Sequence, residues 1–282
     1  MSITAKIIAD SINSTGNRIT TFVCTYPRFI HAEILTHRQF SRSSASSRAI
    51  PVSKLIDMVE SNPAMPIHWG KNRKGMSAGE QVDNLDQERA MKEWLSASKD
   101  AVQHAKTMAA LGIHKQVVNR VLEPYVHMTT LITATEWGNF FNLRAHKDAQ
   151  PELQDLAFKM LHEYSISQPA YKKPGEWHLP FGDQYVSSDM PLDKLLKITT
   201  ARAARVSYLN FEGDLDIQKD CDLHDQLVKD GHMSPTEHAA CALSSSERSG
   251  NLCGWTQYRK MFTEENKQAF NINKLKEAKN VS

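Results

Sequence analysis

The chain begins with two short stretches rich in apolar and β-branched residues, and these predict a pair of strands. The stretches cover residues 5–9 and 19–25, and the turn-forming sequence Ser-Thr-Gly-Asn (14–17) lies between them. From Pro27 the apolar residues recur at helical spacing, which predicts a helix that ends near Phe40. The pattern therefore indicates a β-hairpin followed by a helix.

That helix and the polar segment after it contain the first charged motif. His37 and Arg38 would lie in the last helical turn, and the sequence SRSSASSRAIP (41–51) would follow as a loop. Together with Arg42 and Arg48, Arg38 falls within eleven residues that also contain five serines. Arginine binds phosphate through paired hydrogen bonds, and hydroxyl and backbone N–H groups add short donors. The motif indicates an anion site, although composition alone favours a solvated basic loop.

The rest of the chain is predicted to be largely helical. Helices are expected at residues 52–60, 80–110, 113–123, 134–145 and from Pro151 onward, with Gly112 ending the second of them. Pro, Gly and polar residues interrupt the pattern at 171–191, order resumes at 192–208, and an amphipathic helix at 216–230 ends at Gly231. Because strands and helices do not alternate as βαβ units, we expect an α+β fold: a mixed β-sheet flanked by helices.

Composition restricts any ligand site to a local patch of the surface. Thirty-four Lys and Arg against 32 Asp and Glu give a net charge of +2, so the chain as a whole is no polycation for nucleic acid or lipid. The four cysteines lack CxxC spacing. No apolar run reaches the about 20 residues of a membrane helix, and the first residues lack the apolar core of a signal peptide. We expect a cytoplasmic enzyme or binding protein with reduced thiols.

Two arginines within apolar helical stretches are further candidates for ligand binding. Arg120 lies in VVNRVLEP, and Arg144 lies in NFFNLRAHKDAQ. A guanidinium on an apolar face must be paired with an acid or must face a ligand. The structural alternative is a salt bridge with Glu123, Glu136 or Asp148.

A second polar motif, GHMSPTEHAA (231–240), contains His232, Ser234, Glu237 and His238. The two histidines lack a standard metal-ligand spacing and a third partner, so we expect no metal. The Ser-Pro-Thr-Glu sequence is typical of the start of a helix or turn. Neither a Rossmann nor a P-loop glycine motif is present, and there is no GxSxG elbow. The residues alone therefore indicate a protein that binds something phosphorylated.

Four segments together resemble the flavin-dependent thymidylate synthases. They are THRQFSRSSASSR (36–48), NFFNLRAHKDAQPEL (139–153), ARAARVSY (201–208) and HMSPTEH (232–238), and VNRVLEP (118–124) is similar to the family's helix ahead of the second. The first matches a signature of Arg-His-Arg, seven residues and Ser. In the family the last two segments come first, so the resemblance implies a circular permutation of the kind found in some viral members.

This resemblance implies a single catalytic domain over residues 1–282. Residues 1–170 would hold the signature and a helical part, 171–197 the new connection, 198–263 the permuted segment and 264–282 a tail. Residues 51–111 and the chain beyond 241 resemble nothing in the family. The family's sites form where subunits meet, which implies a homo-oligomer, either a tetramer or a dimer.

The implied reaction makes dTMP from dUMP, with FAD as cofactor and NADPH and methylenetetrahydrofolate as co-substrates. Cofactor contacts are implied for His37, Arg38, Asn139, Asp148, Ser234 and Glu237. Nucleotide contacts are implied for Glu33, Ser44, Ser46, Ser47, Arg48, Arg120 and Arg144. Catalytic roles are implied for Arg144, Ser46 and His232, with Arg144 stabilising negative charge on the pyrimidine. We expect the guanidinium groups of Arg48, Arg120 and Arg144 to share one cleft, in one chain or in an oligomer.

The sequence departs from the family's pattern at four positions, namely Glu33, Thr36, Ser44 and Asp148, and these leave the reaction open. Glu33, where the family has glutamine, could accept a hydrogen bond from an amino group such as that of cytosine. One alternative is therefore C5 hydroxymethylation, or methylation of another deoxypyrimidine monophosphate such as dCMP, for modified DNA. An alternative from another class is a non-catalytic binder of nucleotides or nucleic acid, against which the near-neutral charge argues.

Overall fold

The computed structural model describes residues 3–185, 189–208 and 216–262. Its main sheet has five strands in the order β3-β4-β2-β1-β5. The strands are β1 (Thr4–Asn13), β2 (Arg18–Pro27), β3 (Ser41–Ser44), β4 (His127–Ala134) and β5 (Ala170–Lys172). All neighbours pair antiparallel except β1 and β5, which are parallel. The predicted hairpin and the mixed sheet flanked by helices are confirmed.

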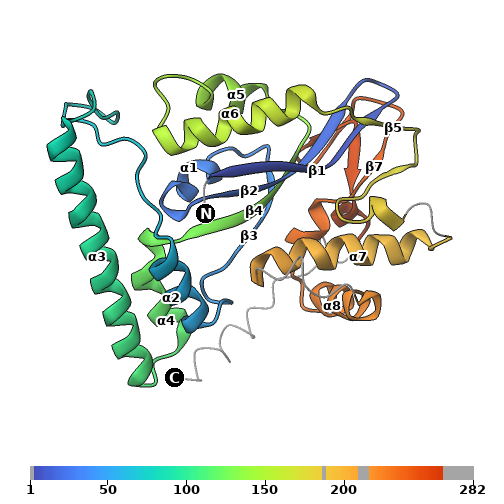
Figure 1. Cartoon of the computed structure of the whole chain (residues 1–282). Helices are drawn as coiled ribbons and strands as arrows, with labels where there is room; N and C mark the ends of the chain where they lie inside the picture. Colours follow the sequence, from blue (N-terminus) through green and yellow to red (C-terminus); the bar gives the residue numbers. More distant parts are fainter. Residues whose placement is uncertain (1–2, 186–188, 209–215, 263–282) are drawn as a thin grey trace, which may run out of the picture.

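Helices cover both faces of this sheet, as Figure 1 shows. One face packs against α6 (Pro151–Ile166), α5 (Gly138–Arg144) and the short α1 (His31–Leu35), through a large apolar cluster that includes Phe22 and Leu156. The other face packs against α7 (Leu192–Arg205), with α8 (Ile217–Lys229) behind it. The predicted helices from Pro151 and at 216–230 are therefore confirmed.

Strand β4 was missed by the sequence pattern because it lies in the sheet interior with both faces covered. Every residue after His127 is buried, so apolar and polar positions do not alternate along it. The helix predicted at 134–145 consequently begins later: residue 134 closes β4, and α5 starts at Gly138.

The helix predicted to end near Phe40 is shorter, and the predicted serine-rich loop contains a strand. A 3-10 turn, η1 (Arg28–Ile30), leads into α1, which ends at Leu35, so His37 and Arg38 follow the helix instead of closing it. Residues 41–44 pair with β4 as β3. Serine has little intrinsic preference for strands, so this strand depends on its partner. The interpretation as a solvated basic loop is wrong.

Residues 51–125 form a helical unit beside the sheet with an apolar core of its own. It contains α2 (Val52–Ser61), α3 (Asn84–Ala110), α4 (Lys115–Val118) and the 3-10 segment η2 (Asn119–Tyr125). The predictions for α2 and for the end of α3 are confirmed, and Gly112 has φ +78°. The start of α3 differs because the Asp83 side chain caps it by accepting from the Asp86 N–H.

The C-terminal part adds a second sheet and several short turns. The sheet order is β10-β7-β6, with β6 (Trp177–His178), β7 (Ala240–Ala242) and β10 (Trp255–Gln257), and a hairpin is formed by β8 (Arg248–Ser249) and β9 (Leu252–Cys253). The 3-10 turns are η3 (Asp183–Tyr185), η4 (Val206–Tyr208), η5 (Ser234–Glu237) and η6 (Tyr258–Met261). The segment expected to be a connection, 171–197, thus contains β6 and the start of α7. The expected tail, 264–282, lies outside the described residues.

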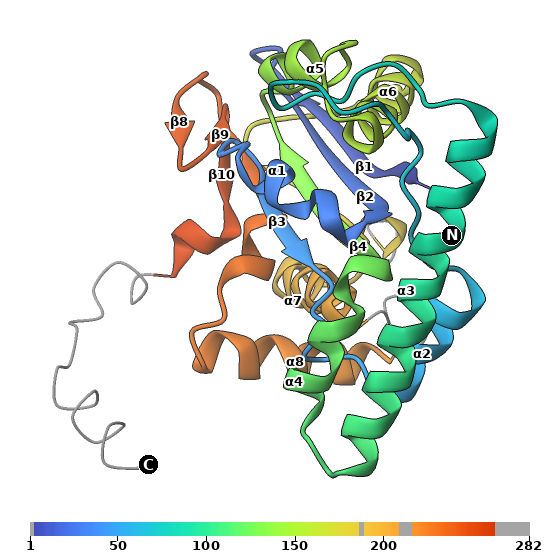
Figure 2. The same ribbon diagram turned by 90° about the vertical axis from the view of Figure 1, so that its left-hand side faces the viewer.

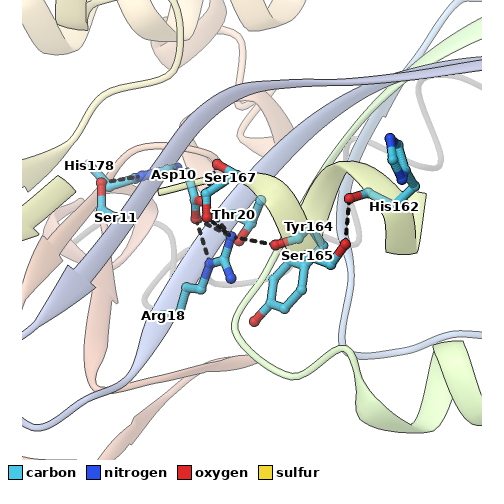
Figure 3. Close-up of polar contacts among 9 residues, drawn as sticks. All are labelled: Asp10, Ser11, Arg18, Thr20, His162, Tyr164, Ser165, Ser167 and His178. Atoms are coloured by element: carbon cyan, nitrogen blue, oxygen red, sulfur yellow. Dashed lines mark hydrogen bonds and ion pairs between the residues drawn. The ribbon is translucent and has the colours of Figure 1, made fainter. Parts of the chain in front are cut away.

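A half-buried ion pair fastens the first hairpin to α6 (Figure 3). Arg18 donates from Nε and Nη2 to the Asp10 carboxylate, at 2.9 and 2.6 Å, and its guanidinium lies 3.8 Å from the ring centroid of Tyr164. Asp10 also accepts from the Thr20 and Ser167 hydroxyls. Strands β1 and β2 are thereby tied to the C-terminal end of α6, where Arg18 also donates to the Tyr164 carbonyl.

Candidate functional site

A cavity of about 580 Å³ lies where the two halves of the chain meet. Its walls come from four segments that are far apart in the sequence: residues 42–49, 114–116, 204–207 and 227–235. In Figure 2, β3 runs toward α7, and α4 and α8 lie beyond its end. The segments that resemble the family's first, third and fourth motifs therefore contribute to one site.

Backbone contacts explain why these walls converge. Strand β3 is held by β4, and both η4 and η5 pack on it. The Ser46 N–H donates to the Ser207 carbonyl at 3.2 Å, and Lys115 Nζ donates to the Ala49 carbonyl at 3.0 Å. Arg42 donates from Nη1 to the carbonyls of residues 34, 35 and 37, which closes the C-terminal end of α1.

The cavity is chemically suited to an anion. Among the described residues that line it, three carry a permanent positive charge, five are serines and none is acidic. The cations are Arg42, Arg48 and Lys115. Ser44 accepts a hydrogen bond from Thr130 Oγ1 at 3.1 Å, so its own hydroxyl proton remains available to a ligand. Charged donors beside neutral hydroxyls are the groups that bind phosphate oxygens.

Five of the residues to which the family resemblance gave roles line this cavity: Ser44, Ser46, Arg48, His232 and Ser234. The first three come from the loop and strand after α1, and the other two come from the segment around η5. The sequence reasoning missed the positions of His114, Lys115 and Gln116, which border the cavity at the start of α4, where Lys115 donates to the Ala49 carbonyl. No local signal marked these residues.

Ser47 and Arg120 lie outside the cavity and bind Glu123. The buried Ser47 hydroxyl donates to Glu123 at 2.6 Å, and Arg120 donates to the same oxygen at 2.8 Å. Arg28 pairs with this carboxylate at 3.1 Å. Burial alone would raise the pKa of Glu123, but the hydrogen bond from Ser47 and the two arginines hold the pKa below its ordinary value. The salt-bridge interpretation of Arg120 is confirmed.

Arg144 forms a second polar group with His37, away from the cavity walls. Its Nε donates to His37 Nε2 at 3.0 Å, and its Nη2 is 3.4 Å from Thr36 Oγ1. Burial, and then the charges of Arg144 and Arg42, lower the pKa of His37 to about 4. Among the described residues Arg144 has no acidic partner, so the salt bridge considered for it is not observed.

The remaining candidates make no side-chain hydrogen bond to either group among the described residues. Arg38, Asn139 and Asp148 are exposed. Glu237 accepts an ion pair from Arg259. Glu33 keeps its Oε2 buried without a hydrogen-bond partner among the described residues.

The three guanidinium groups therefore do not share one cleft within a single chain. Arg48 borders the cavity, Arg120 is bound to Glu123, and Arg144 contacts His37. The expected shared cleft therefore stays a prediction for an oligomer, in which arginines of different copies can meet.

Comparison with known proteins identifies the family. A family model described as "Thymidylate synthase complementing protein" matches residues 17–170, which is more than half of the chain. The chain belongs to this family, the flavin-dependent thymidylate synthase family, and the resemblance is confirmed. The 201–208 and 232–238 segments lie outside the matched span, but the structure packs them against β3 within the same site, as a permuted order requires.

Solved structures share the fold at low identity. A UMP/dUMP methylase, PolB from Streptomyces cacaoi bound with 5-Br UMP, is 16% identical with a TM-score of 0.50, over 58% of this chain and 90% of that chain. The same protein bound with 5-Br dUMP is 15% identical with a TM-score of 0.48, over 58% and 91%. No curated protein matches the sequence. Among the described residues no helix is long and apolar enough to cross a membrane, and no cluster of three metal-binding side chains occurs.

Proposed function

We propose that the protein methylates C5 of dUMP to give dTMP, with methylenetetrahydrofolate as one-carbon donor, FAD as cofactor and NADPH as reductant. The observation that carries this proposal is the cavity itself: residues of the family's signature line it together with cations, and none of its described lining residues is acidic. The shared fold of a methylase bound with 5-Br UMP supports the choice of a pyrimidine nucleotide.

Different residues of the cavity would bind different parts of the nucleotide and its reaction partners. Arg48 and Lys115 would bind the phosphate, with Ser44 and Ser46 as neutral donors at its side. His232 and Ser234, on the opposite segment, would face the cofactor and the folate. Such positioning brings the reacting carbon to a fixed place before any bond changes.

The residues around His37 suit FAD. They offer an exposed guanidinium, Arg38, for a pyrophosphate and the His37–Arg144 pair for the hydrogen-bonding edge of a flavin ring. The other residues proposed to contact FAD are Asn139, Asp148, Ser234 and Glu237. When bound, FAD would supply the carrier for the one-carbon unit and the reducing electrons. Arg144 would stabilise negative charge on the pyrimidine carbonyl as C5 becomes nucleophilic.

A second copy of the chain would complete the site. Arg144 and His37 do not line the cavity of their own chain. In a symmetric homo-oligomer the same contact between two surfaces repeats at every pair of neighbouring copies. If the surface that carries Arg144 meets the surface that carries the cavity, Arg144 of one copy can face the cavity of another. We therefore propose active sites at subunit interfaces.

The test incubates the protein with FAD, NADPH, methylenetetrahydrofolate and either dUMP or dCMP, and identifies the products by mass spectrometry. The expected product is dTMP from dUMP. A protein that neither binds FAD nor changes either nucleotide, but binds oligonucleotides in a salt-sensitive way, would instead be a non-catalytic binder.

Glu33 favours a second candidate reaction. Its Oε2 atom is buried without a partner among the described residues, and an unpaired buried carboxylate oxygen is suited to an amino-group donor. The candidate is modification of an aminopyrimidine such as dCMP, by methylation or hydroxymethylation. Conversion of dCMP would support it, and Glu33→Gln should then shift the preference toward dUMP.

A further inference from the structure

A buried row of hydroxyl and imidazole groups crosses the main sheet and ends at the cavity. We name it the hydroxyl–imidazole chain. Its five hydrogen bonds join Ser11 Oγ to His178 Nδ1 (2.9 Å), His178 Nε2 to Thr21 Oγ1 (2.8 Å), Thr21 to Thr133 Oγ1 (2.7 Å), Thr133 to His238 Nδ1 (2.8 Å) and His238 Nε2 to Ser43 Oγ (2.9 Å). Figure 3 shows its first link, from Ser11 to His178.

The register of the sheet places the four hydroxyls on one face. Thr133 on β4 lies opposite Thr21 on β2. The residue opposite Ser43 is two positions from Thr133, and the residue opposite Thr21 is two positions from Ser11. Residues two positions apart on a strand point to the same face of the sheet, so all four hydroxyls share that face. The imidazoles come from β6 and from the position after η5, and both are fully buried. Of the six groups in this row, only Ser43 lines the cavity.

Counting protons shows that the donors of this chain must all point in the same direction. Burial lowers the pKa of His178 and His238 to about 3, so each imidazole is neutral and carries one N–H. Six groups thus supply six protons for five hydrogen bonds. One proton is left over, and it can lie on Ser11, Thr21, Thr133 or Ser43. On Thr21 or Thr133, which are fully buried and have no further acceptor among the described residues, it would be an unpaired buried donor. With these two positions excluded, all groups donate either toward Ser43 or toward Ser11, and the group at the receiving end keeps the free proton.

The surroundings of the two ends select the direction. Among the described residues the Ser11 hydroxyl contacts only His178, and it is fully buried, so a free proton there would be an unpaired buried donor. Ser43 borders the cavity, where a ligand oxygen can accept its proton. Donation therefore runs from Ser11 toward Ser43.

We propose that the hydroxyl–imidazole chain makes Ser43 a fixed hydrogen-bond donor to an acceptor oxygen of the molecule bound in the cavity. His238 donates from Nε2 to Ser43, so the Ser43 hydroxyl cannot turn its own proton inward. The wall would then favour ligand groups that accept, such as phosphate or carbonyl oxygens, over groups that donate. The identity of that ligand as a nucleotide rests on the proposed function, whereas the direction of donation does not.

The tautomers of the two histidines test the direction without any ligand. Histidine-selective ¹⁵N labelling of the full chain, with signals assigned from His178→Gln and His238→Gln variants, distinguishes protonation at Nδ1 from protonation at Nε2. We expect the Nε2–H tautomer for both residues at neutral pH. The Nδ1–H tautomer at His238, or a protonated ring, would overturn the proposal.

Binding of dUMP tests the consequence. Ser43→Ala should weaken binding by about tenfold, the equivalent of one lost hydrogen bond. Thr133→Val should weaken it several-fold and give His238 a mixture of tautomers, whereas Thr133→Ser restores both. Thr25→Val, on the same face of β2 but outside the chain of bonds, is the matched control. Equal affinity of a folded Thr133→Val variant and the wild type would contradict the role. If the wild type does not bind dUMP, the proposed function fails, and the tautomers still decide this inference.

Discussion

Neighbouring serines of one short segment serve different purposes because their partners differ. The Ser44 hydroxyl accepts from Thr130 and keeps its proton for the cavity, whereas the Ser47 hydroxyl is turned inward to Glu123. The family resemblance implied nucleotide contacts for Ser44, Ser46 and Arg48, and all three line the cavity. The local sequence could not show that the Ser47 hydroxyl turns away, because Glu123 approaches from a segment 76 residues further along.

At this scale Arg48 gives the most direct prediction for ligand binding. Replacement by alanine removes a cation from the cavity and should weaken dUMP binding by about 2–3 kcal/mol, if one charged hydrogen bond is lost. Calorimetric titration measures the change. Arg89→Ala is the control because that arginine is exposed on α3 and pairs only weakly with Asp86. Equal losses in both variants would show that the phosphate binds elsewhere.

The buried histidines predict how stability depends on pH. Folding lowers the pKa of His178 and His238 from 6.5 to about 3, so the unfolded chain binds more protons between these values. The free energy of unfolding should therefore fall as the pH falls below about 6.5, by up to about 1.4 kcal/mol per pH unit for each of these histidines.

Urea unfolding at pH 7, 6 and 5 measures this slope. His238→Gln should flatten it, and substitution of the exposed His104 by glutamine should leave it unchanged. An unaltered slope in the His238 variant would mean that this ring is not buried in its neutral form.

At the scale of secondary-structure elements, the sequence pattern predicted the elements whose apolar residues all lie on one face. Helices α2, α6 and α8 follow this rule, and the β1–β2 hairpin was marked by its turn sequence at 14–17. Strand β4 does not, because both of its faces are buried, and β3 does not, because its serines gain strand structure only from pairing with β4. The region that the sequence marked as a connection forms β6 for a similar reason: its partner, β7, lies more than 60 residues away.

Helices α7 and α8 are joined by a buried cluster that can be tested by one substitution. Asp220 on α8 is fully buried and accepts from Arg202 at 3.0 Å and from Arg205 at 2.9 Å. Asp220→Asn leaves the buried Arg202 without a counter-charge, so we expect destabilisation of about 3–5 kcal/mol in urea unfolding. Asp222→Asn, exposed on the same helix, should change stability by less than about 0.5 kcal/mol. Similar stability of both variants would argue against a structural role for the cluster.

At the scale of the whole molecule, the cationic residues are divided between two places. Arg42, Arg48 and Lys115 line the cavity, whereas Arg144 lies apart from it against the His37 ring, which is neutral at pH 7 because its pKa is lowered to about 4. The family resemblance implied roles for Arg48, Arg144 and His37 but none for Lys115. The positions of these residues relative to one another follow from how strands and helices pack, which no local motif specifies.

Mixing two inactive variants tests whether subunits share the site. Arg48→Ala and Arg144→Ala should each abolish or strongly reduce turnover. If the two arginines come from different copies, co-assembled variants contain some sites with both intact, about a quarter of them for random assembly. Recovery of activity to that level supports the shared site. No recovery in oligomers shown to contain both variants would place the two arginines of a working site in one copy.

The cavity's position between residues 42–49 and 227–235 also has a consequence for synthesis. Because the ribosome synthesises the chain from the first residue onward, the β1–β2 hairpin and the α2–α4 unit emerge long before residues 227–235, the opposite wall of the cavity, have been made. Contacts that join such distant segments form slowly. A growing chain should therefore acquire affinity for its ligand only when its last quarter has emerged, and nascent chains that stop earlier should present β3 with one side uncovered to chaperones.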